Sequence, residues 1–110
     1  MITDLNYLKT MSGGDAKFIN EMIALFREQI EEYSNLMPDL LQKKDYEGLS
    51  KLAHKAKSSV AIMGMSEVGE LLKELEINTH EKKETERYEP LISHFLEQSN
   101  LAIAELEGSH

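Results

Sequence analysis

The segment of residues 48–66 holds the side chains best suited to chemistry. It contains His54 and three lysines, Lys51, Lys55 and Lys57, but no acidic residue, although Asp and Glu together number 20 in the 110-residue chain. A neutral imidazole nitrogen is a nucleophile that can accept a phosphoryl group, and nearby ammonium groups stabilise the negative charge that this group brings. The segment therefore has the composition of a nucleophilic site.

The helical period places His54 away from the predicted core. At about 100° per residue, one face collects the apolar side chains Leu49, Leu52, Ala53, Ala56, Val60 and Met63. His54 lies about 140° from Leu49 and Ser58 about 180°, so we expect the imidazole to face solvent, with Lys57 one turn later. On spacing alone, however, a surface histidine among lysines on a solvated face is the simpler interpretation.

Apolar residues recur at intervals of three and four along the whole chain, and no stretch alternates with a period of two. The pattern predicts an all-α protein: an antiparallel up-and-down four-helix bundle with a short extra N-terminal helix. The first expected helix is opened by Thr3 or Asp4 and runs through Met11. The others run from after Asp15 to Leu41, from after Asp45 to Gly64, from after Ser66 to near Asn78 and His80, and from Tyr88 to Leu106, with a charged link at 81–87.

Local signals predict where these helices begin and end. Asp15, Asp45 and Ser66 are expected to cap the second, third and fourth helices through their side chains, and Gly64 to end the third. Thr3 or Asp4 is expected to open the first. Pro38 lacks an N–H, so the second helix is expected to kink or restart between Ser34 and Pro38. Pro90 is expected in the first turns of the last helix.

Composition excludes several classes of function. Residues 1–107 suit a single domain, and Gly108-Ser109-His110 is interpreted as a remnant of recombinant expression. A net charge of -8 disfavours nucleic acid and anionic lipid as partners. No apolar run is long enough for a membrane span and no cysteine is present, which fits a soluble, cytoplasmic protein without disulfides.

Other signals for cofactors are missing. No GxxxxGK[ST] loop occurs, so no nucleotide site and no autonomous kinase activity are expected. Neither His80 nor His94 has a glutamate three residues before it, so the Glu-x-x-His pairs of di-iron bundles are not found and no metal site is predicted.

The segment His54-Lys55-Ala56-Lys57-Ser58-Ser59, followed by Met63-Gly64-Met65, resembles the signature of histidine-containing phosphotransfer (HPt) domains. That signature is a histidine, a lysine three residues later, commonly a glycine after four and a glycine near ten; Ser58 stands where many relatives have the first glycine. Similarity continues in Asp4-Leu5, Tyr7-Leu8, Gly13-Gly14-Asp15, Phe18-Ile19, Leu25-Phe26, Leu72 and Leu75-Glu76.

The resemblance implies a phosphorelay carrier rather than an enzyme. His54 would accept a phosphoryl group from the aspartate of a receiver domain and pass it to another receiver, Lys57 would stabilise the phosphate, and Ser58 would supply a hydrogen bond. The partners implied are response-regulator receivers or a hybrid sensor histidine kinase, with a monomeric carrier, no cofactor of its own, and Mg²⁺ in the receiver. Two alternatives stay open: a module of the same fold that docks without transfer, and a structural segment of a larger sensor kinase.

Overall fold

Five α-helices and one short 3₁₀ helix form the described chain, residues 3–108 of the computed structural model. They are α1 (Asn6–Ser12), α2 (Ala16–Gln42), α3 (Tyr46–Ile62), α4 (Ser66–Glu81), η1 (Thr85–Arg87) and α5 (Tyr88–Gly108). No strand occurs within these residues, and none of the helices in them is long and apolar enough to cross a bilayer. The predicted all-α fold is confirmed. Of the predicted C-terminal remnant, Ser109 and His110 lie outside the described residues.

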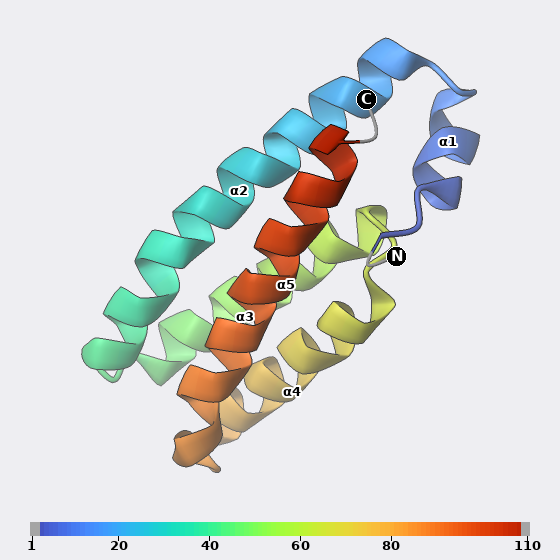
Figure 1. The fold of residues 1–110 in the computed structure, drawn as a ribbon. Coiled ribbons are helices and arrows are strands. Elements are labelled where there is room, and N and C mark those ends of the chain that lie inside the picture. Colours follow the sequence, from blue (N-terminus) through green and yellow to red (C-terminus); the bar gives the residue numbers. More distant parts are fainter. Residues whose placement is uncertain (1–2, 109–110) are drawn as a thin grey trace.

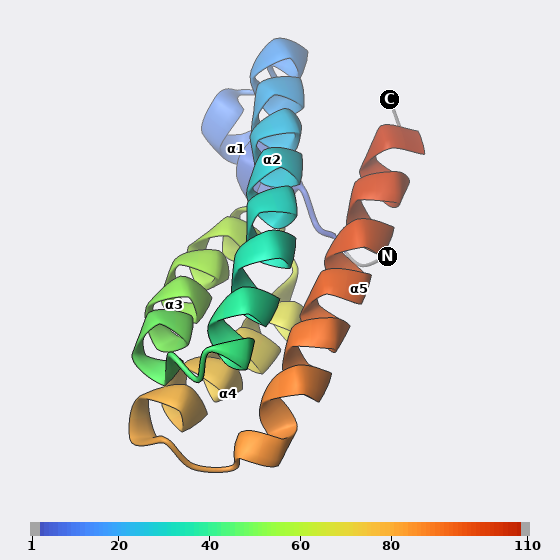
Figure 2. The same ribbon diagram turned by 90° about the vertical axis from the view of Figure 1, so that its left-hand side faces the viewer.

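The four long helices form an antiparallel ring. α2 packs against α3 and α5, and α4 packs against the same two helices. Figures 1 and 2 show that consecutive long helices run in opposite directions. α2 and α5 project beyond the turn between α3 and α4, and α1 packs against α2 at this projecting end. This arrangement is the up-and-down bundle with an extra N-terminal helix that the sequence predicts.

The core of the bundle is a single cluster of buried apolar side chains from all five α-helices. Its largest fully buried members are Tyr33, Phe26, Tyr88 and Phe95. On α3 the predicted core positions Leu49, Ala53, Ala56, Val60 and Met63 are all buried, and Leu52 is half-buried. The buried face of α3 thus fixes which residues of this helix face solvent.

Two of the three predicted side-chain caps are confirmed. The Asp15 carboxylate accepts hydrogen bonds from the N–H groups of Lys17 and Phe18, and Asp45 accepts one from Gly48 at 2.9 Å. Ser66 is wrong as a cap, because it is already the first residue of α4. Met65 precedes it, with its side chain buried in the core and its carbonyl accepting the Gly69 N–H, so core packing rather than a hydroxyl fixes this start.

Two further boundary predictions, at Pro38 and at the start of α1, are only partly met. α2 continues through Pro38 as one helix, with Met37 before it buried and Leu41 after it half-buried, so the helix does not restart there. Its apolar face stays in phase across the proline, which favours continuation over a break. α1 begins at Asn6, slightly later than an opening at Thr3 or Asp4 predicts, and the Asp4 carboxylate accepts the Asn6 N–H at 3.0 Å.

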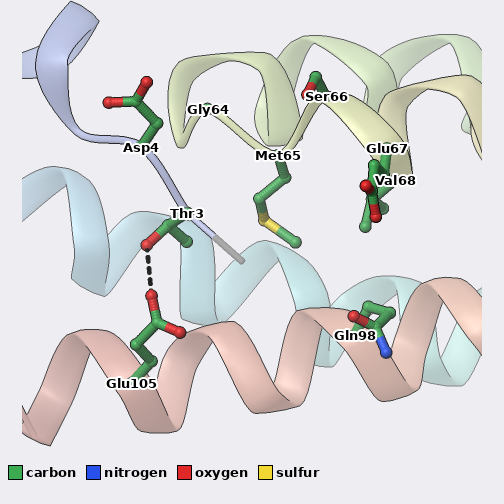
Figure 3. A pocket seen from close by; sticks show the side chains of 9 residues that line it. All are labelled: Thr3, Asp4, Gly64, Met65, Ser66, Glu67, Val68, Gln98 and Glu105. Carbon is green, nitrogen blue, oxygen red and sulfur yellow. Dashed lines mark hydrogen bonds between the residues drawn. The ribbon is translucent and has the colours of Figure 1, made fainter. Parts of the chain in front are cut away.

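The N-terminal segment fastens the turn between α3 and α4 to α5. The Asp4 N–H donates to the Met63 carbonyl at 3.0 Å, and the Thr3 hydroxyl donates to Glu105 of α5 at 3.0 Å. Thr3, Asp4 and Glu105 are among the residues that line a polar cavity of about 600 Å³, which is drawn in Figure 3. The segment therefore holds the closed end of the α3–α4 hairpin, the pair of helices that carries the predicted site.

Candidate functional site: a histidine on helix α3

His54 stands on the solvent side of α3, as the helical period predicts. Its side chain is 69% exposed, while Ala53, one residue before it, and Ala56, two residues after it, are buried. The capped start at Asp45 and the buried apolar face hold α3 in the register that turns His54 outward. The exposure of the imidazole is the first requirement for chemistry with another macromolecule.

The imidazole is oriented by a carboxylate from the neighbouring helix. Nδ1 of His54 lies 2.9 Å from Oε2 of Glu76 on α4. Because an ionised carboxylate can only accept a hydrogen bond, the proton of the neutral ring is assigned to Nδ1. The lone pair then sits on Nε2, which leaves that nitrogen as the nucleophile.

The same carboxylate binds the lysine that follows His54 by one helical turn. Nζ of Lys57 lies 2.6 Å from Oε1 of Glu76. The ammonium group of Lys57, followed by the hydrogen bond from His54, lowers the pKa of Glu76 against the opposing effect of partial burial. Glu76 is therefore an anion at neutral pH, shared between an imidazole and an ammonium group.

Backbone contacts hold Glu76 in place across the α3–α4 seam. The Ser50 hydroxyl, one turn before His54 on α3, donates to the Glu76 carbonyl at 2.9 Å. The Glu76 side chain is 24% exposed, compared with 31% for Lys57. His54, Lys57 and Glu76, hereafter the triad, therefore form a partly enclosed arrangement from which the imidazole protrudes.

Ser58 lies one turn after His54, exposed, and its hydroxyl has no hydrogen-bond partner within residues 3–108. It borders an apolar groove of about 180 Å³ between α2 and α3, lined by Met22, Leu25, Phe26 and Ile62. The structure thus brings His54, Lys57 and Ser58 to one surface of α3.

The remaining predicted cations and histidines are more dispersed. Lys51 makes a loose contact of 3.8 Å with Glu47, and both side chains are more than three-quarters exposed. Lys55 faces the α2–α3 groove. His80 lines a groove beside Glu76, whereas His94 is exposed on α5. Residues 3–108 hold no group of three side chains able to ligate a metal ion.

Glu76 is the site residue that inspection of α3 alone misses. Because residues 48–66 contain no acid, a counter-ion for His54 or Lys57 has to come from another helix. The turn near Met65 gives the signal: in an antiparallel helical hairpin, residues equally far from the turn face each other, and both His54 and Glu76 are eleven residues away.

Comparison with known proteins agrees with this geometry. Residues 21–107 match the family model of the Hpt domain. The chain belongs to the Hpt family. Hpt domains carry phosphoryl groups on histidine in phosphorelays, are not themselves kinases, and act with receiver domains or kinases. Searches of curated proteins and of solved structures give no significant match.

Proposed function

We propose that this Hpt domain accepts a phosphoryl group on Nε2 of His54 from the aspartyl phosphate of a receiver domain, and returns it to the aspartate of another receiver. The observation that carries the proposal is the exposed imidazole whose Nδ1 is tied to Glu76 at 2.9 Å. That contact keeps the ring proton on Nδ1. The lone pair is then on Nε2, the nitrogen that a partner can reach.

The transfer is a substitution at phosphorus. The Nε2 lone pair forms the N–P bond while the bond between phosphorus and the aspartyl oxygen breaks, so the aspartate leaves as a carboxylate. The ring keeps its Nδ1 proton and becomes cationic, and the Glu76 carboxylate 2.9 Å away stabilises it. The reverse substitution delivers the phosphoryl group to the next receiver. Mg²⁺ is expected to be bound in the acidic pocket of the receiver and not by residues of this chain.

Lys57 and Ser58 have supporting roles in this proposal. When His54 is phosphorylated, the Lys57 ammonium group leaves its contact with Glu76 and binds the phosphoryl oxygens instead. These oxygens lie within reach of a side chain one helical turn away. The Ser58 hydroxyl, without an internal partner, can donate a hydrogen bond to the same oxygens. Its small side chain keeps the surface beside the imidazole low enough for a receiver to approach.

The direct test is incubation with a panel of phosphorylated receiver domains. Acid-labile, base-stable phosphate on the Hpt chain, together with loss of phosphate from one receiver and gain by another, would support the proposal; a monomeric carrier should form a 1:1 complex. Binding of receivers without any labelling would instead indicate a docking module of the same fold. If no receiver either bound or transferred, a structural role within a larger kinase would be favoured.

Replacing Lys57 by alanine should slow transfer about tenfold. A charge-assisted contact to phosphate contributes on the order of 1 kcal/mol in water and more once a docked partner excludes solvent, and about 1.4 kcal/mol corresponds to tenfold in rate. The melting temperature should change little, because the ion pair with Glu76 is partly exposed. Rapid-quench transfer assays and thermal melts measure the two effects.

Lys51→Ala and Lys55→Ala serve as controls for this prediction. Neither lysine contacts Glu76, so each variant should lose less activity than Lys57→Ala. Equal small losses in all three variants would mean that the lysines only supply a diffuse positive field. A large fall in melting temperature for Lys57→Ala would mean that its main role is structural.

Replacing Glu76 by alanine should shift the His54 proton from Nδ1 toward Nε2 and slow phosphoryl acceptance. A partly exposed hydrogen bond to a carboxylate is worth about 1 kcal/mol, or roughly fivefold in rate. Glu76→Gln keeps an oxygen that can accept from Nδ1, so its loss should be smaller. The ¹⁵N chemical shifts of the ring report the tautomer directly.

Glu70→Ala is the matched control on α4, because Glu70 is exposed and has no contact with His54. It should leave both the ring shifts and the transfer rate at their original values. Unchanged ¹⁵N shifts in Glu76→Ala would contradict the assignment of Glu76 as the residue that positions the imidazole.

A further inference from the structure

The Glu76 carboxylate and the phosphoryl group use different nitrogens of the His54 ring. Oε2 of Glu76 lies 2.9 Å from Nδ1, whereas the phosphoryl group of the proposed reaction is bound to Nε2. Phosphorylation therefore leaves the contact between the ring and the carboxylate in place. The Glu76 side chain is only 24% exposed, compared with 69% for His54, so water competes weakly with the ring for this carboxylate.

A phosphorylated imidazole donates its phosphoryl group readily only while Nδ1 carries a proton. When the N–P bond breaks, its electron pair returns to Nε2. A ring with the Nδ1 proton leaves as neutral imidazole, but a ring without it would have to leave as the strongly basic imidazolate anion. The new P–O bond forms to a receiver aspartate or to water, and water leaves both of its protons on the released phosphate. The proton on Nδ1 thus decides whether phosphohistidine is a donor.

The cations around the imidazole oppose retention of this proton. Lys51, Lys55 and Lys57 share helix α3 with His54, and like charges disfavour a cationic ring. Lys51 is only loosely held by Glu47, at 3.8 Å. Of the described residues of α2, uncharged ones alone line the adjoining α2–α3 groove. An anion that favours the Nδ1 proton therefore has to come from α4.

Glu76 is the anion that α4 supplies. Among residues 3–108 it is the one carboxylate within ion-pair distance of the imidazole. Lys73, His80 and Glu81 line the same groove along the α3–α4 seam, but no hydrogen bond or ion pair joins them to His54 in the described chain. The proton on Nδ1 thus has a single charged acceptor.

Glu76 stays ionised in both states of the ring. In the unphosphorylated chain the ammonium group of Lys57, 2.6 Å from Oε1, lowers the pKa of Glu76 more than partial burial raises it. In the phosphorylated chain the ring itself is a cation next to Oε2 and replaces Lys57 as the positive partner. A carboxylate beside a cationic N–H favours the protonated ring through its charge as well as through the hydrogen bond.

We propose that the negative charge of Glu76 keeps the proton on Nδ1 of phosphorylated His54, and that this charge sustains phosphoryl donation at neutral and mildly alkaline pH. The inference rests on the proposed function and adds a second task for Glu76. Selecting the tautomer of the neutral ring for acceptance needs only an oxygen that accepts from Nδ1. Holding the proton on a cationic ring for donation needs a charge, so acceptance and donation should respond differently when the charge is removed.

The test measures the decay of phosphohistidine from about pH 5.5 to about pH 9 in the unmodified chain, Glu76→Gln and Glu76→Ala. Phosphoramidate, a small phosphoryl donor, labels each chain and is removed, and first-order decay is then followed in buffer with and without a receiver. At the acid end the three chains should decay at similar rates, because the ring is protonated with or without a neighbouring anion. In both variants the rate should begin to fall at a pH about one unit lower than in the unmodified chain, which makes decay severalfold slower near pH 8.

Glu76→Gln is the decisive variant, because it removes the charge but keeps the size of the side chain and an oxygen that accepts from Nδ1. Its rate of phosphoryl acceptance should be closer to that of the unmodified chain than to that of Glu76→Ala. Its decay profile should instead follow Glu76→Ala. The ¹⁵N chemical shifts of the phosphorylated ring near pH 8 should show Nδ1 protonated in the unmodified chain and largely deprotonated in both variants.

His80→Gln and Glu70→Ala are the controls. Histidine changes its charge near neutral pH and His80 lines the groove beside Glu76, so its replacement tests whether the pH profile originates there. Glu70 is exposed on α4 and makes no contact with His54, so its replacement removes the same charge without touching the ring. Both controls should keep the profile of the unmodified chain.

The outcomes separate this inference from the proposed function. If Glu76→Gln decayed with the profile of the unmodified chain, or if either control shifted the profile as far as Glu76→Gln does, the inference would be wrong while the transfer proposal stood. If the profiles in buffer differed as expected but no receiver took the phosphate at any pH, Glu76 would hold the proton as inferred and the proposed function would fail instead.

Discussion

Replacing His54 by glutamine should abolish phosphoryl transfer to this domain while leaving the bundle folded. Glutamine has no nucleophilic ring nitrogen, yet its amide N–H can still donate to Glu76, so the carboxylate keeps a partner. The side chain at this position is 69% exposed and makes no contact in the core, so the melting temperature should be unchanged. Phosphate labelling from a receiver, followed by mapping of the labelled residue, measures the effect.

His80→Gln and His94→Gln are the controls for this experiment. Both histidines are exposed, as His54 is, but neither makes a hydrogen bond to a carboxylate in the described chain. Both variants should label at the original rate. Acid-labile phosphate on the His54→Gln variant, or label found at His80 or His94, would overturn the assignment of the phosphoacceptor.

The sequence carries enough information to predict the bundle, because long helices have a strong periodic signal. The predicted core positions of α3 are buried apart from the half-buried Leu52, and the apolar face of α2 stays in phase across Pro38. Helix ends are less predictable, as Ser66 shows. Its hydroxyl is a good cap in principle, but the burial of Met65 starts the helix one residue earlier, and that packing is a tertiary effect.

The candidate site is predictable only in part, for a similar reason. The helical period of α3 predicts the exposure of His54 and places Lys57 within one turn of it. It does not predict that Lys57 binds Glu76 in the unphosphorylated chain, because that carboxylate belongs to α4. A local pattern therefore locates the nucleophile, whereas the group that selects its tautomer comes from the packing of two helices.

A glycine in the signature has a structural rather than a chemical role in this chain. Gly64 adopts a φ of +68°, and a Cβ at this position would lie 2.1 Å from the backbone oxygen of Asp4 and 2.7 Å from its nitrogen. Figure 3 shows the close approach of the Asp4 segment to the turn at Gly64. The neighbouring Met63 carbonyl accepts the Asp4 N–H, so only a residue without a side chain allows the N-terminal segment to bind here.

Replacing Gly64 by alanine should consequently destabilise the domain by roughly 3 kcal/mol. The left-handed backbone costs an alanine about 1 kcal/mol or more, and moving the Asp4 backbone aside sacrifices its hydrogen bond to Met63 and the packing around it, about 2 kcal/mol more. For a domain of this size, the melting temperature should fall by about 15 °C. Urea unfolding followed by circular dichroism gives the free energy of unfolding directly.

Gly13→Ala separates the two causes. Gly13 has nearly the same backbone conformation, with a φ of +67°, but a Cβ there would meet no atom within 4 Å. Its alanine variant should therefore lose only the conformational part, about 1 kcal/mol. If both alanine variants lost the same free energy of unfolding, the close approach of Asp4 to Gly64 would contribute nothing to stability. Below its lowered melting temperature, Gly64→Ala should still accept phosphate on His54, because Glu76 and Lys57 lie on helices that the substitution does not touch.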